Sequence, residues 1–392
     1  MHLSISKEEI LDRQTRFYSK LQNSRIDCAV LFNVTDIFYL TGFYFLPSER
    51  PIAFAIDPNQ ETYLFVPALE YDHAEEYAYV DQVHAYPEYP GLRHPMEYLK
   101  DILVKAKFIG RVVGVDANGY SSEKGYHGPT MSDILETTEI KSVQGWVEEL
   151  RIIKSPAEIE LIKESCRWGN LAHRLLQKYS KPGSSEIEIT SRASTEATMA
   201  MIETLGPNYK PHGNPAHAIF RGQVGEMSAF PHAVTQNTIL KKGDTLVTGA
   251  GADVWGYKSE LERTMFVQEV SKEQERYFNL MYEAQEVAFN HIKPGKTTST
   301  VEEAVQNFFE ENGIQHLSSH HTGHSIGLLG HEAPFFDIGD HTVMQPGMVF
   351  TVEPGLYVRG LGGFRHSDTV LVTEDGMEML TYYPRDLDSL IC

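Results

Sequence analysis

Short apolar runs separated by polar, turn-forming stretches dominate the first part of the chain. The runs of strand length are residues 26–32, 51–56, 61–66 and 111–116. Asp57-Pro-Asn-Gln60 lies between two of them and is rich in turn-forming residues, which predicts a strand pair. A further apolar segment, residues 37–40, ends at Thr41-Gly42. We therefore expect an α/β domain over residues 1–150.

The pattern changes to helical periodicity near residue 155. Ser155 suits an N-cap, Pro156 the first helical position, and Glu158 completes a capping box. Further helix starts and stops are Ser271, Lys293-Pro-Gly295, Thr300 and Gly313. The strand-rich stretches are residues 244–268 and 343–374. This pattern predicts an α+β domain over residues 151–392, with helices backing a curved antiparallel sheet.

Length, charge and cysteine usage narrow the class of protein. A chain of 392 residues suits two domains. A net charge of −20 argues against nucleic-acid or anionic-membrane partners. No apolar run approaches the about 20 residues of a membrane helix, and the N-terminus becomes charged at once, so we expect no secretory signal. The three cysteines, Cys28, Cys166 and Cys392, have neither disulfide-framework nor zinc-site spacing. We expect a cytoplasmic protein.

Charged residues alternate along the predicted strand at residues 256–267. Lys258, Glu260 and Glu262 share one face of this strand, because successive side chains point to opposite sides. Two carboxylates this close repel each other unless a metal, a cationic substrate or Lys258 and solvent offset the charge. The alternative is a solvated charged face.

Histidines gather in the last third of the chain. His320, His321, His324 and His331 fall within twelve residues, between small residues. Imidazole serves near neutral pH as base, acid or ligand, so we expect at least one of them to be functional. Glu353 lies between an apolar strand and Pro-Gly, either as a turn carboxylate or as an active-site group.

Taken together, these segments resemble the superfamily of methionine aminopeptidase, prolidase, aminopeptidase P and creatinase. The resemblance covers nearly the whole chain. It is carried by residues 151–158, Pro231-His232, Gly256-Tyr257, Arg263-Thr264, Gly323-His324, 331–334, 353–356 and 368–372. The resemblance implies an N-terminal α/β domain of the creatinase/prolidase type, a pita-bread catalytic domain and a homodimer.

Metal-dependent members of this superfamily share five ligands: two Asp, one His and two Glu. By resemblance, these positions hold Gly249, Glu260, His324, Glu353 and Ser367 in this chain. Two positions cannot supply a charged oxygen, which should abolish a pair of bridged ions. We therefore expect no metal cofactor. The alternative is a weak or mononuclear manganese or cobalt site at Glu260, His324 and Glu353.

In its site residues the chain is most similar to creatinase, a metal-independent member. The resemblance makes His232 the proton shuttle, Glu262 and Glu353 the paired carboxylates, and His324 a group that orients substrate or assists proton transfer. Substrate contacts are expected from Arg50 of the other protomer, Tyr257, Glu260, His331 and His366. The chain departs from creatinase at Ser367, where creatinase has a second histidine, and in its peptidase-like segment 331–333.

The expected function is hydrolysis of a carbon–nitrogen bond in a small amide, amidine or dipeptide-like substrate, with histidine-based activation of water and no metal. Two alternatives remain open. One is a metal-dependent Xaa-Pro dipeptidase or aminopeptidase. The other is a catalytically inactive homologue that acts as a binding protein.

Overall fold

The computed structural model describes residues 3–120, 125–136 and 138–392. The chain forms two compact units, Ile5–Arg151 and Ile152–Cys392, the latter together with the segment before Ile5. Each unit has mixed α and β content, and each is described by itself below.

The N-terminal unit is built around a six-stranded sheet with strand order β4-β3-β2-β1-β5-β6. The β1–β2 and β2–β3 pairs are antiparallel, and the other three pairs are parallel. The strands are β1 (Cys28–Leu31), β2 (Ala53–Ile56), β3 (Thr62–Pro67), β4 (Gln82–Tyr86), β5 (Val112–Val115) and β6 (Glu139–Ser142).

Helices accompany this sheet, as expected for an α/β domain. They are α1 (Lys7–Asn23), α2 (Val34–Thr41), the 3₁₀ helix η1 (Ala68–Glu70), α3 (Tyr71–Tyr77), α4 (Pro95–Lys105), α5 (Met131–Ile134) and α6 (Trp146–Arg151). Strands β1, β2 and β3 are buried along their whole length, which explains why they read as continuous apolar runs. The apolar segment 37–40 lies in α2, which Asn33 caps and Gly42 ends in a left-handed conformation.

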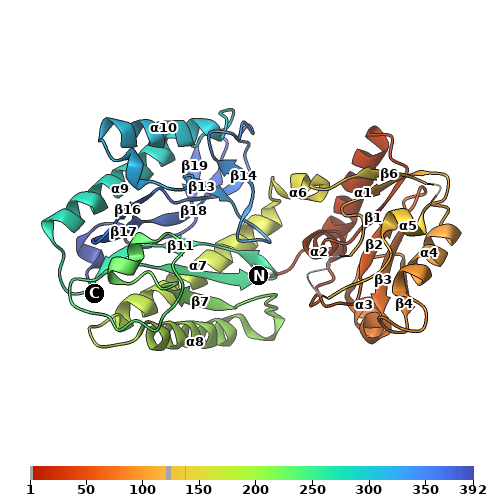
Figure 1. Cartoon of the computed structure of the whole chain (residues 1–392), viewed down its shortest axis with the longest axis horizontal. Coiled ribbons are helices and arrows are strands. Elements are labelled where there is room, and N and C mark those ends of the chain that lie inside the picture. The colour runs from red at the N-terminus through yellow and green to blue at the C-terminus, as the bar shows by residue number, and fades with distance from the viewer. Residues whose placement is uncertain (1–2, 121–124, 137) are drawn as a thin grey trace. The chain divides into compact units, whose positions relative to one another are not determined.

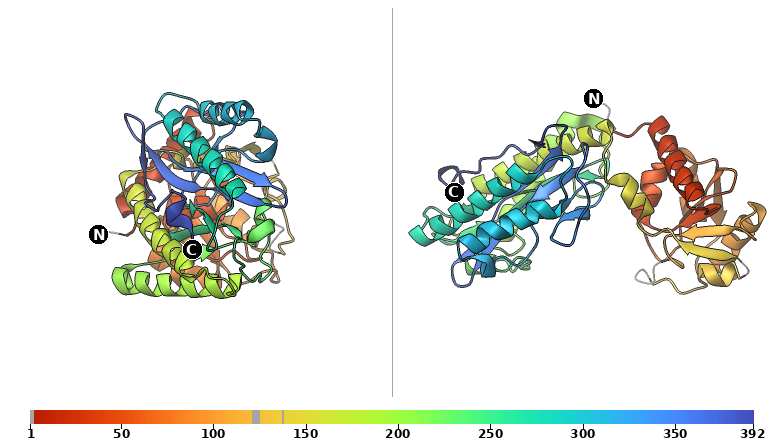
Figure 2. Two further views of the ribbon diagram at one scale, coloured as in Figure 1. Left: turned by 90° about the vertical axis from the view of Figure 1, so that its left-hand side faces the viewer. Right: turned by 90° about the horizontal axis from the view of Figure 1, so that it is seen from above.

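Four long helices cover the sheet of the second unit (Figure 1). They are α7 (Pro156–Tyr179), α8 (Glu186–Leu205), α9 (Lys272–His291) and α10 (Ser299–Glu311). Helix α7 packs on α8 and β9 (Gly249–Val254), and α9 packs on α10 and on β15 (Val349–Val352), β16 (Gly355–Val358) and β17 (Gly362–Arg365). The right-hand view of Figure 2 shows α9 and α10, which pack on each other, running side by side. The capping box of Ser155 and Glu158 forms as the sequence predicts.

The sheet of the second unit has nine strands, and its described pairs are all antiparallel. Its main path is β10-β9-β11-β18-β15-β13-β14, with β7 beside β9 and β19 beside β18. The strands are β7 (Ala216–Ile219), β9 (Gly249–Val254), β10 (Tyr257–Lys258), β11 (Leu261–Glu262), β13 (Gly323–Ser325), β14 (Glu332–Phe336), β15 (Val349–Val352), β18 (Ser367–Val372) and β19 (Met377–Met379).

Two strand pairs and four 3₁₀ helices complete the unit. The pairs are β8 (Thr245–Val247) with β12 (Thr264–Phe266), and β16 (Gly355–Val358) with β17 (Gly362–Arg365). The 3₁₀ helices are η3 (Gly206–Asn208), η4 (Gly225–Ala229), η5 (Gln315–Leu317) and η6 (Asp388–Leu390). The expected fold class, an α/β domain followed by an α+β domain with helices on an antiparallel sheet, is confirmed.

None of the helices formed by the described residues combines the length and hydropathy needed to cross a bilayer.

Candidate active site

Four neighbouring strands of the nine-stranded sheet bring the candidate residues together. Glu260 directly precedes β11, and Glu262 ends it. In the β11–β18 pair, Glu262 lies opposite Ser367. Strand β15 ends directly before Glu353, and β13 holds His324. The order β11-β18-β15-β13 therefore places residues that are up to 107 positions apart, such as Glu260 and Ser367, in direct contact.

His324 is fully buried. Its Nε2 lies 3.1 Å from Glu353 Oε1, and its Nδ1 lies 3.0 Å from the carbonyl oxygen of Ser325. The contact with Glu353 is poorly aligned for a hydrogen bond, so buried Nε2 has no well-directed partner among the described residues. A backbone carbonyl at Nδ1 is the usual way in which a protein fixes the tautomer of a histidine that binds a metal through Nε2.

In the absence of a metal, His324 and Glu353 form an ion pair. Burial opposes the charge on His324, but Glu353 and Glu260 outweigh it and raise the pKa of His324 to about 9. Burial likewise opposes the charge on Glu353, whereas His324 and Arg365 lower the pKa of Glu353 to about 2. A metal bound at Nε2 would have to displace the proton of His324.

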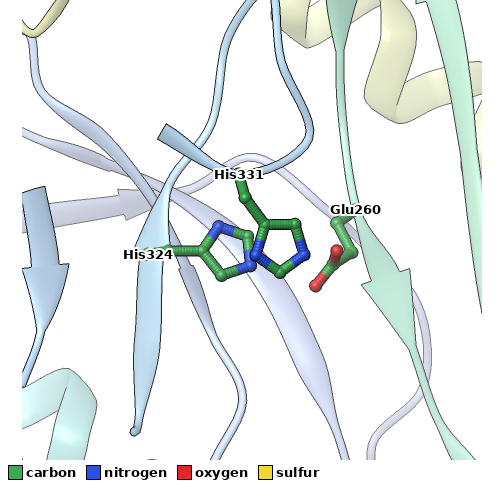
Figure 3. Close-up of side chains that lie close together, drawn as sticks. All are labelled: Glu260, His324 and His331. Atoms are coloured by element: carbon green, nitrogen blue, oxygen red, sulfur yellow. The ribbon is translucent and has the colours of Figure 1, made fainter. Parts of the chain in front are cut away.

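Glu260 faces the two stacked imidazoles of His324 and His331 (Figure 3). The two rings lie 3.8 Å apart with an interplanar angle of 22°. Ligand atoms of Glu260, His324 and His331 all lie within 4.8 Å of one another, as do those of Glu260, Glu262 and Glu353. Burial, with the charges of Glu353 and Glu262, raises the pKa of Glu260 to about 7. These carboxylates and imidazoles form a compact set of potential metal ligands.

Glu262 is held by two guanidinium groups. Arg365 donates to it through Nε and through Nη2, the latter at 2.9 Å from Oε1, and Arg221 donates to the same Oε1. Arg365 also donates to the hydroxyl of Tyr357 at 2.8 Å, and its Nε lies 3.8 Å from Glu353 Oε2. Both carboxylate oxygens of Glu262 accept hydrogen bonds from arginine, so Glu262 is poorly placed to bind a metal as well.

Gly249 and Ser367 lie at this same cluster. A Cβ at Gly249 would stand 3.5 Å from Glu262 Oε1, and the Ser367 hydroxyl donates to Glu260 Oε1 at 2.8 Å. Neither residue can neutralise a second cation. The loss of these two oxygen ligands, which the sequence indicates, is thus accompanied by serine and arginine contacts to the remaining carboxylates.

Charge balance favours one divalent cation. The three carboxylates of Glu260, Glu262 and Glu353 and the two guanidinium groups leave one negative charge when the histidines are neutral. One divalent cation would change this net charge to +1, whereas two divalent cations would change it to +3. The remaining donors, imidazole and carboxylate, suit zinc, manganese or cobalt. A single metal ion would lie at Glu260 and His324, with His331 stacked on His324 and Glu353 Oε1 3.1 Å from His324 Nε2 as the further ligand candidates.

Other predicted site residues lie outside this cluster. His366 is fully buried, with Nε2 3.1 Å from the carbonyl oxygen of Arg385 and its ring against Phe278. It adjoins Ser367 on an extended backbone, so its side chain points to the opposite face. Tyr257 is buried, and its hydroxyl donates to Glu158 at 2.6 Å. These partners thus lie outside the set of Glu260, Glu262 and Glu353.

His232 and Arg50 occupy more exposed positions. His232 follows η4 on the surface, and its ring forms no hydrogen bond or ion pair with any described residue. Its neighbour Pro231 has its carbonyl oxygen 3.5 Å from Arg365 Nη1, which places this loop beside the cluster. Arg50 belongs to the N-terminal unit, where Nε and Nη2 donate to Glu88 at 2.6 and 3.2 Å.

Sequence reasoning missed the roles of Arg221 and Arg365. Arg365 lies two residues before Ser367, a position that the resemblance singled out, but its contact with Glu262 depends on the pairing of β11 with β18. Arg221 has a φ of 52°, unusual for a residue other than glycine, and no local sequence signal indicates it.

Comparison with known proteins agrees with this geometry. Residues 160–374, more than half of the chain, match the model of metallopeptidase family M24, and residues 13–153 match the creatinase/prolidase N-terminal domain. The putative dipeptidase YkvY of Bacillus subtilis is 27% identical over 379 residues, 96% of this chain and 99% of that protein. An Xaa-Pro dipeptidase of Pyrococcus horikoshii is 28% identical over 370 residues, 94% of this chain and 96% of that protein.

Solved structures of prolidases and Xaa-Pro dipeptidases are also similar to this chain. The prolidase of Pyrococcus horikoshii superposes with a TM-score of 0.81 at 26% identity, covering 96% of this chain and 99% of that one. The Xaa-Pro dipeptidase of Bacillus anthracis superposes with a TM-score of 0.80, also at 26% identity and with the same coverage.

These findings correct one expectation and confirm two. The expectation of no metal cofactor is wrong, because the matching family is one of metallopeptidases and the structure brings Glu260, His324 and His331 together as potential metal ligands. The sequence indicates which two ligand positions are lost, but it does not show that the remaining carboxylates and imidazoles lie close together. The creatinase-like reaction without a metal is therefore unsupported. The expected superfamily and the expected hydrolase class are confirmed: the chain belongs to metallopeptidase family M24.

Proposed function

We propose that this protein is a metal-dependent Xaa-Pro dipeptidase or aminopeptidase that works with one divalent cation bound by Glu260, His324 and Glu353. The observation that carries the proposal is buried His324 Nε2, which lacks a well-directed partner and lies 3.1 Å from Glu353 Oε1. The substrate class is supported by relatives that match nearly the full chain and are described as Xaa-Pro dipeptidases.

A bound divalent cation would polarise the scissile carbonyl and lower the pKa of a water molecule. The chain's own residues orient the groups around it. Ser367 fixes Glu260 by donating to Oε1, and Arg365 fixes Glu262. His331 presents its imidazole against His324 and is proposed to contact the substrate. His232, in the loop beside Arg365, remains our candidate for protonating the leaving nitrogen.

The oligomeric state and the location stay predictions. A homodimer in which Arg50 reaches the substrate of the partner subunit is part of this proposal, as is a cytoplasmic location. A pocket of about 420 Å³ is lined by Glu260 and Glu262, and this volume is consistent with a small-molecule substrate.

Activity against alanyl-proline tests the proposal. We expect hydrolysis by the purified protein, loss of hydrolysis after exhaustive chelation, and recovery when manganese, cobalt or zinc is added. Glu353→Gln and His324→Gln should not recover, because each removes a metal ligand. His316→Gln, at an exposed position in η5, is the matched control and should behave as the unmodified protein. Full activity in the chelated protein would disprove the metal dependence. An inactive binding protein would hydrolyse nothing even when loaded with metal.

A further inference from the structure

A buried lysine, Lys154, contacts the segments that carry the two stacked histidines. It directly precedes Ser155, the N-cap of α7, and its side chain is 1% exposed. Its ammonium group donates to the Ser325 hydroxyl at 3.0 Å and lies 3.5 Å from Glu332 Oε2. The Glu332 side chain is 6% exposed, so this ion pair is buried. Because a buried charge is costly unless it is paired, the ammonium group depends on these contacts.

Each of these two partners directly follows one of the stacked histidines. Ser325 follows His324 in β13, and its carbonyl oxygen lies 3.0 Å from His324 Nδ1. Glu332 begins β14 and follows His331. One ammonium group therefore connects the two stretches of backbone that carry the imidazoles shown in Figure 3.

The pairing of β13 with β14 is irregular at this point. His324 lies opposite Phe335, but the next residue, Ser325, lies opposite Glu332. A bulge of this kind disrupts the ladder and re-aims the neighbouring side chains. The strand pairing alone therefore does not set the spacing of the two imidazoles, whereas a contact that spans the irregularity can set it.

The loop between the two histidines fits closely against this ion pair. A Cβ at Gly327 would stand 3.0 Å from Glu332 Oε2 and 3.1 Å from Lys154 Cε. The backbone N–H of Leu329 donates to Glu332 Oε1 at 2.9 Å. The ion pair thus anchors the loop as well as the two strands.

Stability alone is a weak explanation for a buried ion pair. Replacing both partners by uncharged residues of similar size is often neutral or stabilising, whereas removing one partner is strongly destabilising. The best-attested use of such a pair is to fix the register of the elements that it joins. Here those elements carry His324 and His331.

We propose that Lys154 is a positioning residue that holds the imidazoles of His324 and His331 in their stacked arrangement by bridging Ser325 and Glu332. The arrangement of the imidazoles stands on the geometry of the protein alone. Its consequence for the metal rests on the proposed function, in which His324 is a ligand. Loss of a group that orients a ligand histidine typically weakens metal binding by about 10- to 100-fold.

The double variant Lys154→Met, Glu332→Gln separates positioning from stability. It removes the bridge without leaving a buried charge unpaired, and glutamine keeps an acceptor for Leu329. Urea denaturation should therefore give a stability close to that of the unmodified protein. Lys163→Met is the matched control, because Lys163 also pairs with glutamate but its side chain is 31% exposed.

NMR of the metal-free, full-length protein with labelled histidine tests the arrangement of the imidazoles. The ring current of each imidazole shifts the ring protons of the other upfield, and His324→Gln and His331→Gln assign these signals. We expect the upfield shifts in the unmodified protein and in Lys163→Met, and their loss in the double variant.

Competition with a chelating dye for manganese, cobalt or zinc tests the consequence for the metal. The double variant should bind the ion at least about ten-fold more weakly than the unmodified protein, although its stability is similar. Ser325→Ala removes one contact of Lys154 without changing any charge. It should shift the ring signals and the affinity in the same direction, and it provides the test if the double variant does not fold.

Two results would overturn the positioning role: absence of upfield shifts in the unmodified protein, or unchanged shifts in the folded double variant. Lost shifts with unchanged metal affinity would support the arrangement and overturn its effect on the metal. A lack of metal binding and of alanyl-proline hydrolysis in the unmodified protein would refute the proposed function, while the ring shifts would still decide whether Lys154 positions the imidazoles.

Discussion

At the scale of single residues, the site depends on how its carboxylates are neutralised. Glu262 is 2% exposed and receives hydrogen bonds from Arg365 and Arg221. Arg365 is also buried and connects Glu262 to Tyr357. Arginine is suited to this task because its planar guanidinium group donates to several acceptors in fixed directions. The cluster therefore orders the carboxylates whether or not a metal is bound.

Arg365→Met should strongly destabilise the fold, because it leaves Glu262 buried with only the partly exposed Arg221 as a partner. We expect a loss of about 3–5 kcal/mol in the free energy of unfolding, as measured by urea denaturation. Arg167→Met is the matched control, since the Arg167 side chain is 63% exposed, and it should change stability by less than about 0.5 kcal/mol. Similar small effects of both substitutions would contradict the role given to Arg365.

At the scale of elements, α7 and β9 form the inner support of the site. A Cβ at Gly169 of α7 would stand 3.0 Å from Gly251 Cα, so the helix approaches the strand closely. Ser165 donates to the carbonyl oxygen of Ala252 at 2.6 Å, and His173 Nε2 lies 2.7 Å from Thr248 Oγ1. Burial lowers the pKa of His173 to about 3 from its usual value of 6.5.

The neutral His173 makes stability depend on pH. The unfolded chain binds a proton at this histidine below about pH 6.5, whereas the folded protein does so only below about pH 3. Stability should therefore fall as the pH drops through this window, with a contribution from His173 of up to roughly 1.4 kcal/mol per pH unit. Urea denaturation between pH 7 and 4 should show a shallower slope for His173→Gln than for the unmodified protein. Equal slopes would contradict this account, and the exposed variant His316→Gln should leave the slope unchanged.

Local features of these elements were predictable, and long-range ones were not. The capping box of Ser155 and Glu158 depends on residues three apart, so the sequence alone indicates it. The shared face of Lys258, Glu260 and Glu262 follows from strand alternation. The burial of His366 away from the site depends on which strands pair with β18, and no local pattern encodes that choice. The contact of Arg221 with Glu262 likewise spans 41 positions.

At the scale of the whole molecule, two units divide the chain, and the ligand cluster lies entirely in the second. Glu260, His324 and Glu353 come from three neighbouring parts of one antiparallel sheet. The prediction of family and fold from the sequence succeeded because its motifs mark the ends of these strands. The prediction about the metal failed, because the convergence of Glu260, His324 and His331 becomes visible only in three dimensions.

The number of metal ions bound per chain tests the central claim most directly. Native mass spectrometry and elemental analysis of protein loaded with manganese, cobalt or zinc should give one ion per chain, and none for Glu353→Gln or His324→Gln. The ion should also be required for hydrolysis of alanyl-proline. Two ions per chain, or an active protein that contains none, would contradict the account.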